Sequence, residues 1–207
     1  MYLDKPLQQF LDELASSQST PGGGSASALC GAMGAALASM VARLTLGKAA
    51  YAGVQPEIEK LLSETEKLRE RFQLLMQEDI DAYGRLSAAF KMPRSTPEES
   101  EARSQAIQAR LVEAALVPLE MVESASKLLQ YCSRIAAIGN ANVLSDVATG
   151  SLLASSAANG AAEIVRVNLR SMKDPERVEV LTDRLNVALE EIAERSRQVT
   201  GIIGSRG

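Results

Sequence analysis

Residues 20–42 read TPGGGSASALCGAMGAALASMVA, a stretch without a single charged side chain. After the glycine turn, small residues repeat at helical spacing, at Ala28, Gly31, Ala35, Ala38 and Ala42. Small side chains let neighbouring backbones approach each other closely. This stretch therefore predicts a helix that runs to about Leu46 and lies at the centre of a helical bundle or of a dimer interface.

An uncharged run of this length also suits a membrane span, which needs about 20 predominantly apolar residues. Here glycines and serines dilute the run, and nothing before it resembles the basic head of a signal peptide. A buried helix fits this composition better than a span does. We therefore expect a protein without a membrane partner.

The rest of the chain also reads as helix, divided by prolines that favour helix starts and disrupt helix interiors. The segment Thr96-Pro97-Glu98-Glu99 resembles a helix start with acids in its first turn. Expected helices cover residues 3–16, 56–91, 97–132 with a kink at Pro118, 142–169, and a last segment from Pro175. No alternating β-branched run indicates a strand. The 207 residues thus predict one all-α, multi-helix bundle over residues 1–207.

Composition excludes several classes of function. The chain contains no histidine, which rules out a Ser-His-Asp triad and any His-ligated metal site. Lys and Arg total 22 against 26 Asp and Glu, so no overall basic field is available to bind nucleic acid. Cys30 and Cys132 are not spaced as a ligand pair and indicate reduced, structural thiols in a cytoplasmic protein. We expect no metal and no cofactor.

One carboxylate interrupts the apolar stripe of the predicted helix 56–91. Steps of four and three residues place six side chains on one face, namely Phe72, Met76, Asp79, Tyr83, Leu86 and Phe90. A carboxylate that faces the core loses hydration, which raises its pKa and suits general acid–base catalysis. The alternative is structural: Asp79 caps or bridges a neighbouring helix through a Lys or Arg. Glu78 and Asp81 fall off this face and are expected in solvent.

Three further groups are weaker candidates when they are read from the residues alone. Asn142 and Asp146 share a face if a helix has begun there, but the residues alone favour a structural role, with Asn140 or Asn142 as a helix cap and Asp146 as a first-turn acid. The run Gly22, Gly23 and Gly24 before a helix is either a flexible turn or an anion site. It lacks the Lys and Ser/Thr of a P-loop. Lys48 follows the uncharged helix, where an isolated lysine is usually solvated.

Several motifs together resemble one family. They occur in the family's order along nearly the whole chain: Pro21-Gly22-Gly23-Gly24-Ser25-Ala26, residues 45–51, Glu78-Asp79-Ile80-Asp81-Ala82-Tyr83, Gly139-Asn140-Ala141-Asn142 with Ser145-Asp146, and Val167-Asn168-Leu169. Each motif is weak alone, but the combination is similar to the cyclodeaminase/cyclohydrolase family. That family includes the cyclodeaminase domain of formiminotransferase-cyclodeaminase and stand-alone bacterial methenyltetrahydrofolate cyclohydrolases.

The resemblance implies an all-helical fold, a homodimer or dimer-based oligomer, and a tetrahydrofolate substrate. Matched motif by motif, it makes site residues of Asp79, Asp146, Asn142, Asn168, Lys48 and the glycines 22–24. Two positions depart from the family pattern. This chain has Lys48 where relatives often carry several consecutive lysines, and Ile164 where they commonly carry an Asn.

Two reactions fit this resemblance: hydrolysis of 5,10-methenyltetrahydrofolate to 10-formyltetrahydrofolate, and loss of ammonia from formiminotetrahydrofolate to form the methenyl compound. Because no formiminotransferase domain is fused to the chain, we expect the cyclohydrolase. In this hypothesis Asp79 is the acid–base group. Asp146 with Asn142 orients water or a folate nitrogen, and Lys48 meets the glutamate tail. A non-catalytic helical dimer or binding module is the alternative from another class.

Overall fold

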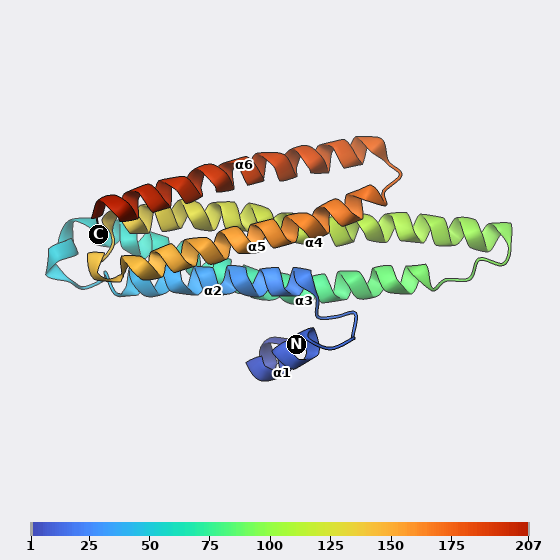
Figure 1. Ribbon diagram of the computed structural model, residues 1–207, viewed down its shortest axis with the longest axis horizontal. Helices are drawn as coiled ribbons and strands as arrows, with labels where there is room; N and C mark the ends of the chain where they lie inside the picture. Colours follow the sequence, from blue (N-terminus) through green and yellow to red (C-terminus); the bar gives the residue numbers. More distant parts are fainter. Residues whose placement is uncertain (1, 207) are drawn as a thin grey trace.

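Five long helices run along the long axis of the molecule in the computed structural model, which describes residues 2–206 (Figure 1). They are α2 (Gly23–Arg43), α3 (Gln55–Phe90), α4 (Pro97–Ile138), α5 (Leu144–Arg170) and α6 (Pro175–Arg206). A short helix, α1 (Leu7–Leu14), lies beside this body. Within the described residues no strand occurs, so the all-α prediction is confirmed. The outermost residues of the predicted domain, 1 and 207, lie outside that range.

Several predicted helix ends were wrong by a few residues. The expected helix 3–16 is a 3-10 turn, Tyr2–Asp4, followed by α1, because Pro6 takes the N-cap position between them. The second helix ends at Arg43, not near Leu46. By contrast, α4 continues past Cys132 to Ile138, since Ile135 and Ala136 are still buried in the core. The helix expected from Asn142 starts at Leu144, after a 3-10 turn.

The uncharged helix α2 lies in the core, as its small residues predicted. Its Gly31 leaves room for the Phe72 ring of α3, because a Cβ on that glycine would lie 2.5 Å from two ring carbons. Gly34 meets α5 at Gly150, where a Cβ would lie 2.8 Å from the Gly150 carbonyl oxygen. By length and composition α2 would suit a membrane span, but 61% of its most apolar window is buried inside the bundle.

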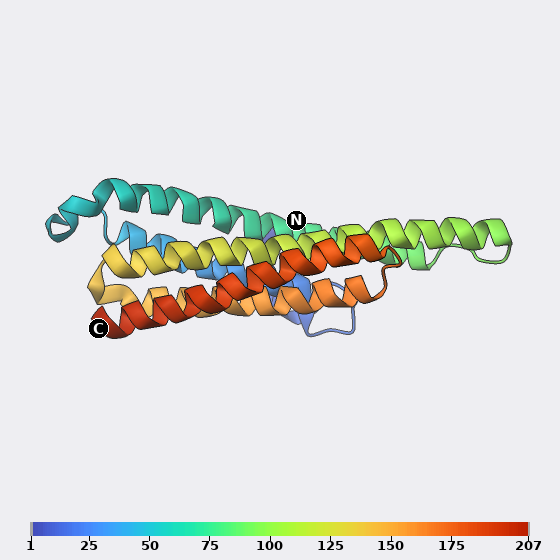
Figure 2. The same cartoon turned by 90° about the horizontal axis from the view of Figure 1, so that it is seen from above.

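Helices α2 and α5 run antiparallel along this small-residue contact. Gly23 lies near Ile164, Ser27 near Gly160, and Gly34 near Gly150. The start of α2 therefore lies beside the end of α5. A view turned by 90° shows that all five long helices stay roughly aligned with the same axis (Figure 2).

The longest helix, α4, packs against α2, α3, α5 and α6 and joins the layers of the bundle. Its start has a capping box, in which Thr96 Oγ1 accepts from the Glu99 amide and the Glu99 carboxylate accepts from the Thr96 amide. The helix continues through Pro118. The core is aliphatic and rich in alanine, and Phe10 and Phe72 are its buried aromatic residues in the described part of the chain.

Candidate active site

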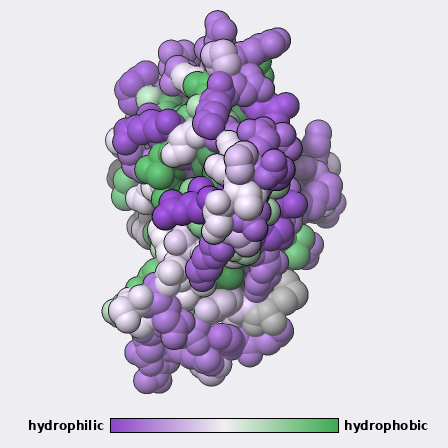
Figure 3. Space-filling model, turned by 90° about the vertical axis from the view of Figure 1, so that its right-hand side faces the viewer, coloured by the Kyte–Doolittle hydropathy of each residue, from purple (hydrophilic) through white to green (hydrophobic). Residues whose placement is uncertain are grey.

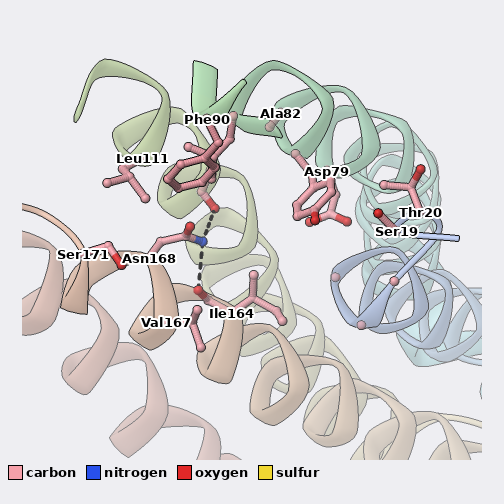
Figure 4. Close-up of a pocket in the computed structure, with 16 residues that line it drawn as sticks. Ser19, Thr20, Asp79, Ala82, Phe90, Leu111, Ile164, Val167, Asn168 and Ser171 are labelled. Carbon is pink, nitrogen blue, oxygen red and sulfur yellow. Dashed lines mark hydrogen bonds between the residues drawn. The ribbon is translucent and has the colours of Figure 1, made fainter. Parts of the chain in front are cut away.

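A cavity of about 340 Å³ opens where the start of α2 meets the last third of α3 and the end of α5 (Figure 4). The middle of α4 and residues 19–20 complete its wall. Its polar side chains belong to Ser19, Thr20, Asp79, Tyr83, Asn168 and Ser171. Seen from this end of the bundle, the surface is mainly hydrophilic, with apolar side chains visible in between (Figure 3).

The Asp79 carboxyl group lies at the start of α2. The Ser25 hydroxyl donates to Asp79 Oδ2 at 3.0 Å, and the Ser25 backbone N–H donates to the same carboxyl group. Helix α2 has no side-chain cap of its own, so Asp79 satisfies one of its free amides from a different helix. Burial raises the pKa of Asp79, and the two bonds from Ser25 oppose that shift.

These contacts decide between the two interpretations of Asp79 in part. No Lys or Arg of the described residues forms an ion pair with Asp79, so the proposed bridge through a cation was wrong. A capping contact exists, but it runs through Ser25. The carboxyl group also lines the cavity, and burial shifts its pKa upward, the direction that favours acid–base chemistry.

Gly24 allows this close approach of Asp79. A Cβ on Gly24 would lie 2.5 Å from Asp79 Cγ and 2.6 Å from Oδ2. Gly22 and Gly23 also line the cavity. Helix N-termini attract anions, and here the anion at the glycine turn is the carboxylate of the chain itself.

Asn168 lies across the cavity from Asp79, near the end of α5 (Figure 4). Only 7% of the residue is exposed. Its Nδ2 donates to the carbonyl oxygens of Ala114 and Ile164, both at 2.9 Å. Asn168 therefore joins α4 to α5 and faces the cavity as well.

The apolar stripe of α3 changes its role along the helix. Phe72 and Met76 are buried in the core, as the spacing predicted. Tyr83 and Phe90, which the same spacing assigned to that face, are 44% and 49% exposed and line the cavity instead. The stripe therefore faces the core in its first half and an open pocket in its second half.

The remaining predicted site residues lie at the opposite end of α2 and α5. Lys48 is exposed after the end of α2, Asn142 is exposed in a 3-10 turn, and Asp146 is half-buried in the first turn of α5. With 21 residues at about 1.5 Å each, α2 separates this end from Asp79 by about 30 Å. None of the three lines the cavity.

Asn140 and Tyr51 hold this second end together. The Asn140 amide donates to Thr45 Oγ1 at 2.9 Å, and its Nδ2 donates to the Leu44 carbonyl at 3.0 Å. The Ala141 amide donates to the Tyr51 hydroxyl at 3.0 Å. The structure thus brings the segments of Lys48 and Asn142 side by side. Asn140 takes the capping role that was one interpretation of this motif, since its Oδ1 accepts from the Asn142 amide.

Ser25 is the contact of Asp79 that the sequence interpretation missed. Its position at the third residue of α2 was a usable signal, because the amides of the first helical turn need acceptors. Nothing in the sequence, however, showed which distant carboxylate would supply one.

The cysteines and acidic groups of the described residues indicate neither an activated thiol nor a metal site. Both thiols are free, and burial raises the pKa of Cys132 to about 12, so that thiol stays protonated at neutral pH. Residues 2–206 also contain no group of three or more His, Cys, Asp or Glu side chains able to hold a metal ion.

Comparison with known proteins places these features in a family. A family model described as formiminotransferase-cyclodeaminase matches residues 6–187. The methenyltetrahydrofolate cyclohydrolase of Methylorubrum extorquens is 38% identical over 171 residues, which is 83% of this chain and 82% of that protein. The formimidoyltransferase-cyclodeaminase of Rattus norvegicus is 31% identical over 99% of this chain, which spans only 38% of that longer protein.

A solved structure shows the same architecture. The crystal structure of formiminotetrahydrofolate cyclodeaminase from Thermotoga maritima superposes with a TM-score of 0.90 at 27% identity. The match covers 99% of this chain and 98% of that one. The helical bundle described above is therefore shared over its whole length.

Proposed function

This chain belongs to the formiminotransferase-cyclodeaminase family of folate one-carbon enzymes, and we propose that it hydrolyses 5,10-methenyltetrahydrofolate to 10-formyltetrahydrofolate. Its relatives are enzymes, which favours a catalyst over a non-catalytic dimer or binding module. The match to a cyclohydrolase over most of both chains favours this reaction.

The observation that carries the proposal is the Asp79 carboxyl group in the cavity wall. Burial raises its pKa above the ordinary aspartate value, which makes the group a better proton acceptor than an exposed carboxylate. Its negative charge also favours a cationic substrate. The bonds from Ser25 hold the group in place in the cavity wall.

In this mechanism water adds to the cationic carbon that bridges N5 and N10 of the folate. The Asp79 carboxylate removes one proton from the water, and that proton passes to N5 as the bond between N5 and the carbon breaks. The water oxygen remains on the carbon as the formyl oxygen of the N10 product. The second proton of the water leaves to solvent, which balances the reaction.

Formiminotetrahydrofolate cyclodeaminase is the second candidate, favoured by the shared architecture with the Thermotoga maritima enzyme. There N10 attacks the formimino carbon and ammonia leaves. Protonated Asp79 would donate to that leaving nitrogen. The same carboxyl group therefore serves either reaction, in opposite protonation states.

The walls of the cavity suit a flat, partly apolar ligand. Tyr83 and Phe90 offer exposed aromatic rings at the rim, on which a ring system can stack.

We propose that the folate is the only small molecule required, without metal or further cofactor, in a cytoplasmic enzyme. Turnover that persists in EDTA supports this part of the proposal, and loss of turnover contradicts it.

We also propose that the working form is a homodimer. Lys48, Asn142 and Asp146 lie about 30 Å from Asp79, so they reach the folate only if a second copy contributes them. The outward face of α2 supports this arrangement, because exposed Met33 and Met40 lie on this helix, exposed Leu44 follows its end, and residues 20–42 carry no charge. Antiparallel pairing of two such faces brings the second end of one copy towards the Asp79 end of the other.

A pair of assays tests the reaction. Purified protein is added to 5,10-methenyltetrahydrofolate, whose absorbance disappears on hydrolysis, and in parallel to formiminotetrahydrofolate. The proposal predicts loss of the methenyl absorbance well above the rate without enzyme. If only formiminotetrahydrofolate is turned over, the protein is a cyclodeaminase, the second candidate. If neither substrate is turned over, both proposed reactions are contradicted.

A further inference from the structure

Pro118 removes one helical hydrogen bond from α4, next to the cavity. Proline has no backbone N–H, so the carbonyl four residues earlier, that of Ala114, lacks its usual helical partner. Asn168 Nδ2 donates to this carbonyl at 2.9 Å, from α5. Ala114 lines the cavity together with Asn168, so this replacement bond lies in the cavity wall.

The bonds of Asn168 also fix the orientation of its amide. The same Nδ2 donates to the Ile164 carbonyl at 2.9 Å, which occupies its second hydrogen. Two carbonyl acceptors around one amide atom identify that atom as the nitrogen. A flipped amide would place Oδ1 against two carbonyl oxygens and leave the Ala114 carbonyl without a donor.

Asn168 Oδ1 is consequently an acceptor with a fixed position. Asn168 is more than nine-tenths buried and lines the cavity, and its Oδ1 has no hydrogen-bond partner among the described residues. Close to it the wall is apolar, formed by Leu111, Ile164 and Val167. A ligand that enters this part of the cavity removes water from Oδ1, and the lost hydrogen bond is restored only if the ligand supplies a donor.

We propose that Pro118 and Asn168 together form a fixed acceptor that recognises an N–H group of the reduced pterin ring. This inference rests on the proposed folate function. Asp79, across the cavity, acts at the bridging carbon, and Asn168 Oδ1 accepts a hydrogen bond from an N–H group of the pterin ring system. Pro118 is a positioning residue, because it creates the free carbonyl that holds the amide. A ligand that offers only acceptors at this position is rejected.

Calorimetric titration with tetrahydrofolate tests the proposal, and p-aminobenzoylglutamate, which lacks the pterin ring, is the control ligand. Asn168→Leu should weaken tetrahydrofolate binding about tenfold and leave binding of the control ligand unchanged. Gln108→Leu is the matched control variant. Gln108 also joins α4 to the end of α5, through Ser171 and Lys173, but it does not line the cavity. Its loss should leave both affinities unchanged.

Pro118→Ala separates positioning from packing. The new N–H at residue 118 can bond to the Ala114 carbonyl and compete with Asn168 Nδ2 for it, so the amide of Asn168 is held less firmly while the residue remains chemically intact. We expect about threefold weaker tetrahydrofolate binding in the wild-type background and no further change in the Asn168→Leu background. If Asn168→Leu fails to fold, the tetrahydrofolate affinity of Pro118→Ala in the wild-type background tests the inference alone.

Unchanged affinity in Asn168→Leu, or an equal effect of Pro118→Ala in both backgrounds, would overturn the inference and leave the proposed function intact. Wild-type protein that binds no tetrahydrofolate would instead overturn the proposed function, and the inference with it.

Discussion

Among single residues, Asp79 is subject to two opposing effects on the pKa of its carboxyl group. Removal from water favours its protonated form, and the bonds from Ser25 favour the carboxylate. The balance leaves a carboxyl group whose pKa is raised but whose position is fixed. Acid–base catalysis needs both properties, because the proton must be exchangeable and the distance to the substrate must be constant.

The close fit of Gly24 against Asp79 leads to a first prediction. In Gly24→Ala the new Cβ displaces the carboxyl group, so we expect turnover to fall about 100-fold, as for a catalytic group that is moved by about 1 Å. Gly84→Ala, on the same helix as Asp79, is the control, because no atom lies within 4 Å of its added Cβ. It should keep full turnover. Equal turnover of the two variants would show that the position of Asp79 is unimportant.

The raised pKa of Asp79 predicts how stability depends on pH. As pH rises above the ordinary aspartate value of 3.8, the unfolded chain loses this proton first, while the folded chain retains it. Folded protein then binds more protons, so the free energy of unfolding falls until pH passes the raised pKa. The Asp79→Asn variant has no titrating group at this position, so this fall in the free energy of unfolding is absent. Its melting temperature should therefore rise relative to wild type between acid and neutral pH.

The same melting temperatures, measured from acid to neutral pH, can also contradict this prediction. A variant that loses stability relative to wild type as pH rises would mean that the folded chain holds Asp79 as a stabilised carboxylate.

Helical periodicity predicted the inward direction of Asp79 but not the cavity. The spacing of Phe72, Met76 and Asp79 describes one helix face, and it carries no information about where the neighbouring helices end. Because α2 starts at Gly23, it does not cover the face of α3 beyond that point. Tyr83 and Phe90 therefore line a pocket, and Ser25 became visible as a partner only in three dimensions.

At the scale of helices, the contact between α2 and α5 decides the arrangement of the bundle. Small residues on both helices allow the backbones to approach, and the spacing of small residues in the uncharged run predicted a close approach but not that α5 would be the neighbour. Helix ends were predicted less well, because they depend on local caps. Pro6 and Asn140 moved two of them through contacts that spacing does not encode.

Gly34→Ala tests this contact. The added Cβ would lie 2.8 Å from the Gly150 carbonyl oxygen and 3.3 Å from the Ala154 nitrogen, and backbone atoms in a packed helix cannot move aside cheaply. We expect the free energy of unfolding in urea to fall by about 1–3 kcal/mol. Gly201→Ala in α6, where the Cβ enters open space, should be neutral or stabilising. Equal stability of the two variants would mean that the contact is not close-packed.

At the scale of the whole molecule, the candidate residues fall into two groups at opposite ends of the bundle. The resemblance placed Asp79, Asn168, Lys48, Asn142 and Asp146 in one site. A single copy brings Asp79 and Asn168 together at one end and the other three at the far end. Sequence order cannot reveal this separation, because α2 and α5 each connect one end to the other.

Mixing two inactive variants tests the proposed dimer. We expect Asp79→Asn and Asp146→Asn to be inactive alone. In a mixed dimer one of the two sites combines an intact Asp79 with an intact Asp146 from the other copy. Co-refolding equal amounts should therefore restore about a quarter of wild-type turnover. No recovery, or full activity of Asp146→Asn alone, would contradict a site that is shared in this way.

In the proposed mechanism the Asp79 carboxyl group carries the proton transfers of folate one-carbon chemistry. Turnover of 5,10-methenyltetrahydrofolate and of formiminotetrahydrofolate by Asp79→Asn tests it most directly, with Asp81→Asn, an exposed carboxylate on the same helix, as the control. We predict that Asp79→Asn loses at least about 100-fold in kcat on the wild-type substrate, while Asp81→Asn keeps wild-type turnover. Full turnover of both substrates by a folded Asp79→Asn protein would contradict the account.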